Sequence, residues 1–306
     1  MARCFVTREL PGPALDRLRA AHDVAVWPQA RAMTTEELAQ STSDAEGLLT
    51  MLTDRIDAPF LDGCPKLRAI ANYAVGFDNI DVPAARQRGI QVGNTPDVLT
   101  GATADLTLAL LLSIARGLPG AADIVRRGDW QAWGPTSYLG HEVHGATLGI
   151  IGLGRIGRAV AQRAAGFEME ILHTGRGGVP LLQLLARSDF VSLHCPLTPE
   201  TRHLIDAAAL AEMRPTAFLI NTARGPIVDQ RALRQALIEA QIAGAALDVT
   251  DPEPLPPQDP LFQAPNLLVV PHIGSATHAT REAMASAAVE NLLAALAGEP
   301  MPHEVT

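Results

Sequence analysis

The chain has 306 residues, of which 47% are hydrophobic and 19% are charged, and its formal net charge is −9. This length suits two domains of roughly 100 to 200 residues each in a globular protein. The acidic balance argues against nucleic acid or an anionic membrane surface as a partner, because phosphate binding needs clusters of Lys and Arg that no stretch supplies.

The three cysteines are odd in number and show neither metal nor redox spacing, which predicts a reduced, cytoplasmic compartment. The N-terminal segment is expected to be a short strand and not a signal peptide, because Arg8 and Glu9 interrupt its apolar run.

Residues 3–100 alternate short apolar runs with helical ones, which predicts a parallel sheet covered by helices. The expected strands are residues 4–6, 24–26, 47–49 and 67–70, and a last one near residues 91–96, where an apolar strand runs into a proline. The expected helices are residues 13–21 and 35–40.

An apolar helix is expected over residues 101–116, too short to span a bilayer and therefore buried or at an interface. The loop after it carries Trp130 and Trp133, which indicates an interface or a pocket wall, unless these rings only pack the loop onto the sheet. His141 and His144 lie in the same region, but two histidines in a loop are more often solvated, and we predict no metal site.

The central motif of the chain spans residues 146–157, where a short apolar strand runs into three glycines and then a helix. Gly152 would allow the tight turn, Gly154 would let a pyrophosphate approach the backbone, and Gly157 would let the helix pack closely on the strand. The amides at the helix N-terminus would then hold the phosphates of a dinucleotide.

Further short apolar runs and helical segments alternate to the end of the chain, which predicts a second α/β unit. We expect the last helix to return to the first unit. The expected strands are residues 168–173, 190–193, 218–220, 245–247 and 267–270, and the expected helices are residues 181–186, 230–241 and 281–297.

Three polar stretches follow predicted strands of the second unit, at the edge where open α/β sheets bind their ligands: residues 221–225, 248–254 and 271–275. In these stretches Arg224 can hold a 2-oxo acid through its carboxylate and carbonyl oxygens. His272 can protonate the alkoxide formed by hydride transfer, since histidine titrates near neutral pH, and Glu253 can stabilise its imidazolium. Taken singly, each residue could also be an ordinary surface or loop residue.

Five segments resemble the D-isomer-specific 2-hydroxyacid dehydrogenases: residues 71–81, 152–157, 221–225, 251–254 and 271–275. Residues 101–105 and the loop 130–140 are similar to the glyoxylate/hydroxypyruvate reductase branch of that family. The resemblance covers nearly the whole chain and implies a small 2-oxo acid or 2-hydroxy acid as substrate.

The resemblance also implies two doubly wound parallel-sheet domains with the active site in a cleft between them. A flavodoxin-like substrate domain would comprise residues 1–99 and 277–306, and a Rossmann dinucleotide-binding domain would comprise residues 100–276. A homodimer would form on the nucleotide domains, through the helix 101–116 and the loop after it.

By the same resemblance, Arg224 binds substrate, Glu253 and His272 form the acid–base pair, and the backbone amides of Val75 and Gly76 bind the substrate carboxylate. The positions that match cofactor contacts lie in the glycine turn, at the nicotinamide end and beside the adenosine ribose. They are Gly152, Leu153, Gly154, Arg155, Ile156, Gly157, Thr103, Thr222, Ala223, Asp248, His272, Gly274, Cys195 and Pro196.

The choice of cofactor depends on the end of the strand 168–173, where an NAD enzyme usually has an acid that binds the ribose 2′-hydroxyl. Here Arg176 lies there instead and could pair with a 2′-phosphate, so NADP is favoured over NAD. The segment 177–188 is about ten residues shorter than is usual in the family, which predicts a smaller nucleotide sheet and a more open adenosine side.

Several alternatives stay open. The substrate could be another D-2-hydroxy acid, phosphoglycerate, formate or phosphite, although Glu253 disfavours formate and the chain has no room for the regulatory domain frequent in phosphoglycerate dehydrogenases. A protein that senses dinucleotides without catalysis, or a degenerate member that binds cofactor poorly, would retain similar residues.

Overall fold

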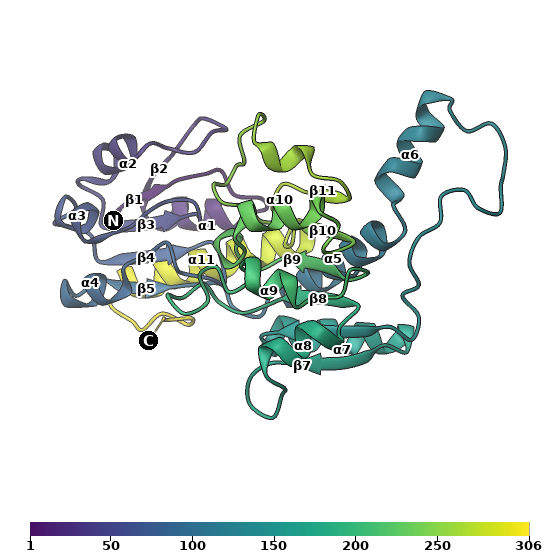
Figure 1. Cartoon of the computed structure of the whole chain (residues 1–306). Coiled ribbons are helices and arrows are strands. Elements are labelled where there is room, and N and C mark those ends of the chain that lie inside the picture. The colour runs from purple at the N-terminus through teal and green to yellow at the C-terminus, as the bar shows by residue number, and fades with distance from the viewer. Residues whose placement is uncertain (306) are drawn as a thin grey trace. The chain divides into compact units, whose positions relative to one another are not determined.

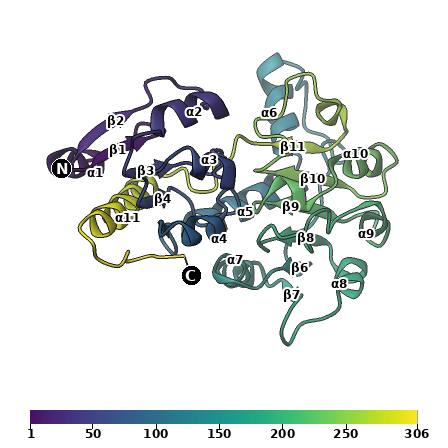
Figure 2. The ribbon, with the colours of Figure 1, turned by 90° about the vertical axis from the view of Figure 1, so that its left-hand side faces the viewer.

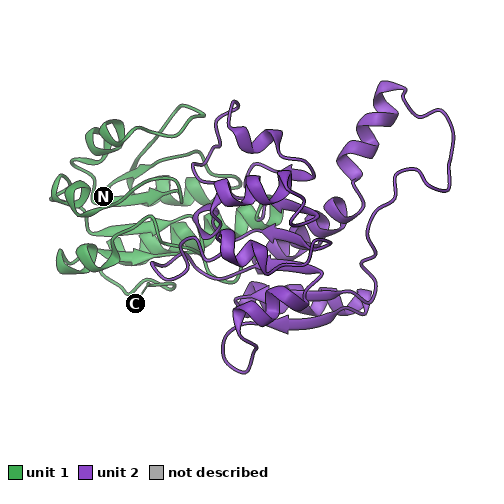
Figure 3. Ribbon diagram, in the orientation of Figure 1, with its two compact units in different colours: residues 1–99, 275–306 green, residues 100–274 purple. Residues whose placement is uncertain are grey.

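The computed structural model describes residues 1–305, which form two compact units. Unit 1 consists of residues 1–99 and the chain from Ser275 onward, and unit 2 of Thr100–Gly274 (Figure 3). Unit 2 ends two residues before the domain boundary expected from the sequence. Gly274 is held in unit 2 by its N–H, which donates to Asp248 at 2.8 Å.

Unit 1 contains a parallel sheet of five strands in the order β2-β1-β3-β4-β5, the flavodoxin-like order (Figure 1). The strands are β1 (Arg3–Val6), β2 (Asp23–Val26), β3 (Gly47–Thr50), β4 (Ala69–Asn72) and β5 (Gln91–Gly93). The central strands β3 and β4 are buried throughout because helices cover both faces of the sheet.

Five helices cover this sheet: α1 (Ala14–Ala21), α2 (Thr35–Thr42), α3 (Ala58–Asp62), α4 (Val82–Gln87) and α11 (His278–Leu296). One apolar core joins α1 and α11 to one face of the sheet, and a second core joins α2, α3 and α4 to the other face (Figure 2). The last helix of the chain therefore packs on the first sheet.

Unit 2 contains a parallel sheet of six strands in the order β11-β10-β9-β8-β6-β7. The strands are β6 (Thr147–Ile151), β7 (Glu170–His173), β8 (Phe190–Leu193), β9 (Phe218–Asn221), β10 (Gly244–Leu247) and β11 (Leu267–Val269). The chain leaves β6 toward the edge strand β7 and then crosses to β8, so the strand order reverses beside β6. Two parallel α/β sheets confirm the predicted fold class.

Five helices of unit 2 pack in two layers on its sheet (Figure 2). They are α5 (Thr100–Ala115), α7 (Arg155–Ala164), α8 (Leu181–Arg187), α9 (Ala207–Ala211) and α10 (Gln230–Ile238). A sixth helix, α6 (Leu118–Arg127), has no buried residue. One core holds α5 and α7 on one face, and another holds α8, α9 and α10 on the opposite face. Single-turn 3-10 helices complete the unit at Ala165–Phe167, Gly225–Ile227 and Pro260–Gln263.

The sequence missed four helices, α3, α4, α6 and α9. Three of them have only five or six residues, too few to show a helical period. Several predicted ends were also wrong. The strand β4 begins two residues later than expected, and α11 begins three residues earlier because Thr277 caps it by accepting from the Thr280 N–H at 3.2 Å.

No single helix within the described residues is long and apolar enough to cross a membrane. Only α5 and α6 taken together pass such a test, and the chain bends by 61° between them.

Candidate active site

The strand register of unit 2 brings the three polar stretches to one edge of the sheet. Asn221 at the end of β9 pairs with Leu247 of β10, which in turn pairs with Val269 of β11. The segments that follow these three strands therefore start side by side. On the other side, β9 pairs with β8 and β8 with β6, so the glycine turn after β6 lies at the same edge.

Glu253 and His272 form a direct pair at this edge. The Nδ1 atom of His272 is hydrogen-bonded to the Oε1 atom of Glu253, and the two side chains are 23% and 27% exposed. The carboxylate thereby fixes the imidazole orientation and leaves Nε2 as the ring nitrogen that can exchange a proton with a ligand. Two bonds from the His272 N–H, to the carbonyls of Asp248 and Val270, both at 3.0 Å, hold its backbone.

The loop that carries Glu253 is tied to unit 2 at two points. Gly225 allows it to approach closely, because a Cβ at that position would lie 2.0 Å from the Thr250 carbonyl oxygen. The side chain of Gln230 bonds both sides of Asp251: it donates to the Asp251 carbonyl at 2.5 Å and accepts from the Asp251 N–H at 2.9 Å. Nothing in the sequence pointed to Gln230, which lies 21 residues from its partner.

Arg224 leaves the sheet through a turn that Asn221 organises. The Asn221 side chain accepts from the Ala223 N–H at 3.0 Å and donates to the Arg224 carbonyl at 2.9 Å. The Arg224 guanidinium donates to the Ala223 carbonyl at 2.8 Å and is partly exposed. The turn thus presents a guanidinium at the edge that also holds His272.

Asp248 holds the backbone just after His272. Its carboxylate accepts from the N–H groups of Ile273, at 2.6 Å, and Gly274, at 2.8 Å. Burial raises the pKa of Asp248 above its usual range, although these two N–H bonds oppose the shift. Thr103 of α5 joins the cluster by donating to the Gly274 carbonyl at 3.3 Å.

Thr222 lies beside this cluster. Its hydroxyl is 3.0 Å from that of Thr107, which also donates to the Thr103 carbonyl at 2.8 Å. Both threonines are buried. The side chains of Thr103, Thr222 and Asp248 thus share one region of unit 2.

The glycine turn has the geometry that a dinucleotide needs. Gly152 has a φ of +97°, and a Cβ there would lie 2.5 Å from the Cys195 nitrogen; a Cβ at Gly157 would lie 2.3 Å from the Gly152 carbonyl oxygen. Gly154 faces open space instead, and as the N-cap of α7 it offers no side chain to the N–H groups of the first turn. The N-terminus of a ten-residue helix that has no side-chain cap fits a phosphate.

Leu153, Arg155 and Ile156 lie in or directly after this turn, and Cys195 and Pro196 follow the neighbouring strand β8. Arg176 is exposed in the tight loop after β7, whose Val179 N–H bonds back to the His173 carbonyl at 2.9 Å. Among residues 1–305 no strand lies beyond β7 in this sheet, and residues 177–188 contain only α8.

Val75 and Gly76 belong to unit 1, in the turn after β4, and both are partly exposed. The structure therefore brings the Arg224, Glu253 and His272 side chains to one edge of unit 2, while the predicted carboxylate-binding turn is part of the other unit.

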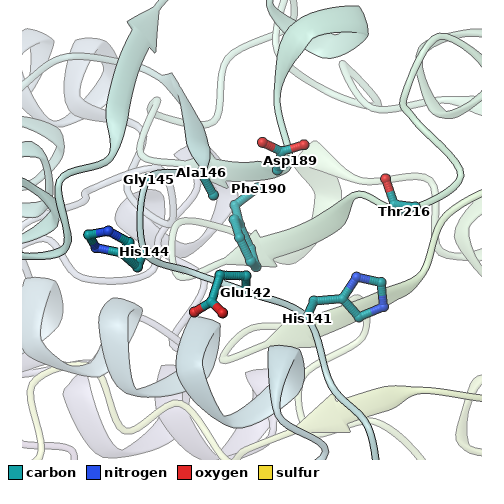
Figure 4. Close-up of a pocket in the computed structure, with 8 residues that line it drawn as sticks. All are labelled: His141, Glu142, His144, Gly145, Ala146, Asp189, Phe190 and Thr216. Carbon is teal, nitrogen blue, oxygen red and sulfur yellow. The ribbon is translucent and has the colours of Figure 1, made fainter.

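A separate cavity of about 280 Å³ opens at the opposite edge of the same sheet (Figure 4). It is lined by residues that precede or begin strands, among them Ala146, Asp189 and Thr216. The Asp189 carboxylate is already used, accepting from the Thr147 N–H at 2.9 Å and from Arg214 at 2.7 Å. Across residues 1–305 no cluster of three or more His, Cys, Asp or Glu could hold a metal ion.

Comparison with known proteins identifies one family and two relatives that cover nearly the whole chain. Residues 108–274 match the family described as D-isomer specific 2-hydroxyacid dehydrogenase, NAD binding domain. A glyoxylate reductase of Korarchaeum cryptofilum is 48% identical over 316 aligned positions, covering 99% of this chain and 95% of that protein. A glyoxylate reductase of Thermococcus gammatolerans is also 48% identical, with coverages of 98% and 94%.

Two solved structures extend the comparison. The TT0316 protein of Thermus thermophilus is 50% identical, with a TM-score of 0.94 and coverages of 99% and 100%. An NADPH-dependent glyoxylate/hydroxypyruvate reductase of Sinorhizobium meliloti, in complex with NADP and malonate, is 34% identical, with a TM-score of 0.86 and coverages of 100% and 97%.

Proposed function

The chain belongs to the D-isomer specific 2-hydroxyacid dehydrogenase family, in the glyoxylate reductase branch, and from this premise we propose that it reduces glyoxylate to glycolate and hydroxypyruvate to D-glycerate. The observation that carries the proposal is the Glu253–His272 pair, which lies at the same sheet edge as Arg224 and the glycine turn.

The roles of the residues follow from their chemistry. A bound reduced dinucleotide would supply the hydride, and the N–H groups after Gly154 would hold its phosphates. Arg224 binds the carboxylate and carbonyl oxygens of the 2-oxo acid, with help from the amides of Val75 and Gly76. His272 donates a proton from Nε2 to the carbonyl oxygen as it becomes an alkoxide, and Glu253 stabilises the imidazolium before that transfer.

The proposed cofactor is NADP. Support comes from Arg176 in the loop after β7, where an acid would repel a 2′-phosphate. The Sinorhizobium meliloti relative described above is NADPH-dependent by its description. The remaining cofactor contacts would come from the residues that the sequence placed near the cofactor: Arg155, Ile156, Thr103, Thr222, Ala223, Asp248, Gly274, Cys195 and Pro196.

The assay that tests the reaction follows the absorbance of NADPH or NADH with glyoxylate, hydroxypyruvate or pyruvate as substrate. We expect turnover of the first two substrates, and a loss of about a hundred- to ten-thousand-fold in kcat for His272→Ala, because a positioned acid contributes that much. His278→Ala, an exposed histidine in the first turn of α11, is the matched control and should keep full activity.

Each other outcome has a distinct meaning. If His272→Ala keeps the same activity as His278→Ala, His272 is not the acid. A folded wild type that binds NADPH but reduces none of the three acids would favour a protein that senses dinucleotides without catalysis.

A further inference from the structure

The turn after β4 is held by donors that bond three consecutive backbone carbonyls. The Ala74 carbonyl accepts from the Thr95 N–H at 2.9 Å. The Val75 carbonyl accepts from the side-chain amide of Asn94 at 2.7 Å, and the Gly76 carbonyl accepts from that of Asn72 at 2.8 Å.

These bonds also set the directions of the N–H groups in the turn. In a trans peptide the C=O and the following N–H point in opposite directions. Holding the carbonyls of Ala74 and Val75 therefore turns the N–H groups of Val75 and Gly76 away from Thr95 and Asn94. Within residues 1–305, neither of these two N–H groups donates a hydrogen bond, although the turn is only partly exposed.

Asn72 is itself fixed by a buried network. It is fully buried, and its amide also donates to the Asn79 side chain at 3.2 Å. Asn79 in turn donates to the carbonyls of Met51, at 3.1 Å, and Asp54, at 3.0 Å. The Asp54 carboxylate is buried and accepts from two threonine hydroxyls and a backbone N–H.

Asn94 is fixed through its backbone, independently of its side chain. Its N–H donates to the His303 carbonyl at 3.1 Å, and its carbonyl accepts from the Asn291 side chain at 2.9 Å. A substitution of the Asn94 side chain therefore removes the bond to Val75 and leaves the anchoring of the backbone in place.

We propose that Asn94 is a positioning residue that orients the Gly76 N–H toward the substrate carboxylate without touching it. Asn94 holds the peptide between Val75 and Gly76, and Asn72 secures the turn by holding the peptide that follows. The proposal rests on the proposed function, since it requires a 2-oxo acid at this turn. A free peptide could rotate and present a carbonyl oxygen, which would repel the carboxylate; the two asparagine amides exclude that orientation.

The test compares the wild type with Asn94→Ala and Asn94→Asp. Loss of one well-oriented N–H bond to a charged group corresponds to about a ten- to hundredfold change in binding. We expect the KM for glyoxylate and the inhibition constant of oxalate to rise together by that factor in Asn94→Ala, with kcat within about threefold of the wild type. Asn94→Asp should show a larger rise, because a carboxylate facing the Val75 carbonyl repels it.

Two controls separate positioning from damage to the fold. The affinity for NADPH, measured by fluorescence, should not change in either variant. Thr34→Ala removes the cap of α2 in the same unit, at a comparable cost in stability, and should lower the melting temperature while leaving the KM for glyoxylate unchanged.

The possible results distinguish this inference from the function it rests on. If the wild type reduces glyoxylate and binds oxalate, but Asn94→Ala and Asn94→Asp keep the wild-type KM and inhibition constant, the positioning role is rejected and the function stands. If the wild type neither reduces glyoxylate nor binds oxalate, both are rejected.

Discussion

The fold changes the titration of His194. It follows β8 beside the glycine turn, where burial lowers its pKa to about 4, and its Nε2 lies 2.8 Å from the Ser192 hydroxyl. A histidine with a lowered pKa binds fewer protons in the folded than in the unfolded state. Its contribution to stability is therefore complete above about pH 6.5 and is lost as the pH falls toward 4.

We expect the free energy of unfolding of the wild type to fall by up to about 1.4 kcal/mol per pH unit across that window because of this one group. His194→Gln should lose this component, so that its urea unfolding curves at pH 6.5 and pH 4.5 lie closer together. His278→Gln replaces an exposed histidine and should retain the wild-type slope. If the free energy of unfolding of His194→Gln depended on pH as steeply as that of the wild type, His194 would not be the group responsible.

Arg176 is the residue on which the proposed cofactor choice depends. It is exposed after β7, which is the edge strand of its sheet among the described residues. We expect Arg176→Ala to raise the KM for NADPH about tenfold or more and to leave the KM for NADH nearly unchanged, since only NADPH carries the 2′-phosphate. Arg187→Ala, on α8, is the control. Equal effects of Arg176→Ala on both cofactors would contradict selection by this side chain.

In the turn between β6 and α7, one glycine is needed for packing and another is proposed to be needed for cofactor binding. Gly157 packs against the Gly152 carbonyl oxygen, whereas Gly154 faces open space at the N-terminus of α7. Gly154→Ala should therefore keep the wild-type melting temperature but weaken NADPH binding, because its methyl group occupies the space that a phosphate needs.

Gly157→Ala is the matched variant and should lose several degrees in melting temperature as well as cofactor affinity, because its Cβ must displace backbone. Differential scanning fluorimetry with and without NADPH measures both quantities. If Gly154→Ala bound NADPH as well as the wild type, the phosphates would have to lie elsewhere.

The presence of a strand was easier to predict from the sequence than its first and last residues. Each strand could be located from its β-branched or apolar run, since buried parallel strands need such residues on both faces. The helix α6 was missed although Pro119 near its start and Arg126 and Arg127 in its last turn are recognisable end signals. Leu118, Ala121, Ala122 and Val125 also follow helical spacing, so the apolar stripe was present in the sequence, although none of the residues of α6 is buried.

In the molecule as a whole, the segment from α6 through the loop to β6 carries several exposed apolar side chains. In Figure 1 it extends away from the sheet of unit 2. Trp130 and Trp133 are 55% and 81% exposed, so they do not pack this loop onto the sheet, and Tyr138 and Leu139 are exposed as well. Exposed large apolar side chains in one segment support the proposal that it pairs with a second copy of the chain.

We expect the wild type to be a dimer by light scattering coupled to gel filtration, and Trp133→Glu to shift the mass toward the monomer, because a charge replaces apolar contact area. Leu182→Glu changes a leucine of α8 that is 56% exposed and should remain dimeric. If the wild type is a monomer at micromolar concentration, the proposal that this segment forms a dimer interface is rejected.

Periodicity and strand-end motifs are local properties of the chain, and they were enough to predict two α/β units, the glycine turn and the three residues proposed for acid–base chemistry and substrate binding. The contacts with distant groups came from the folded chain alone: Gln230 holds Asp251, Asn94 holds Val75, and Glu253 bonds to Nδ1 of His272. These contacts depend on strand register and loop packing, which bring together residues 19 to 21 positions apart without leaving any periodic trace in the sequence.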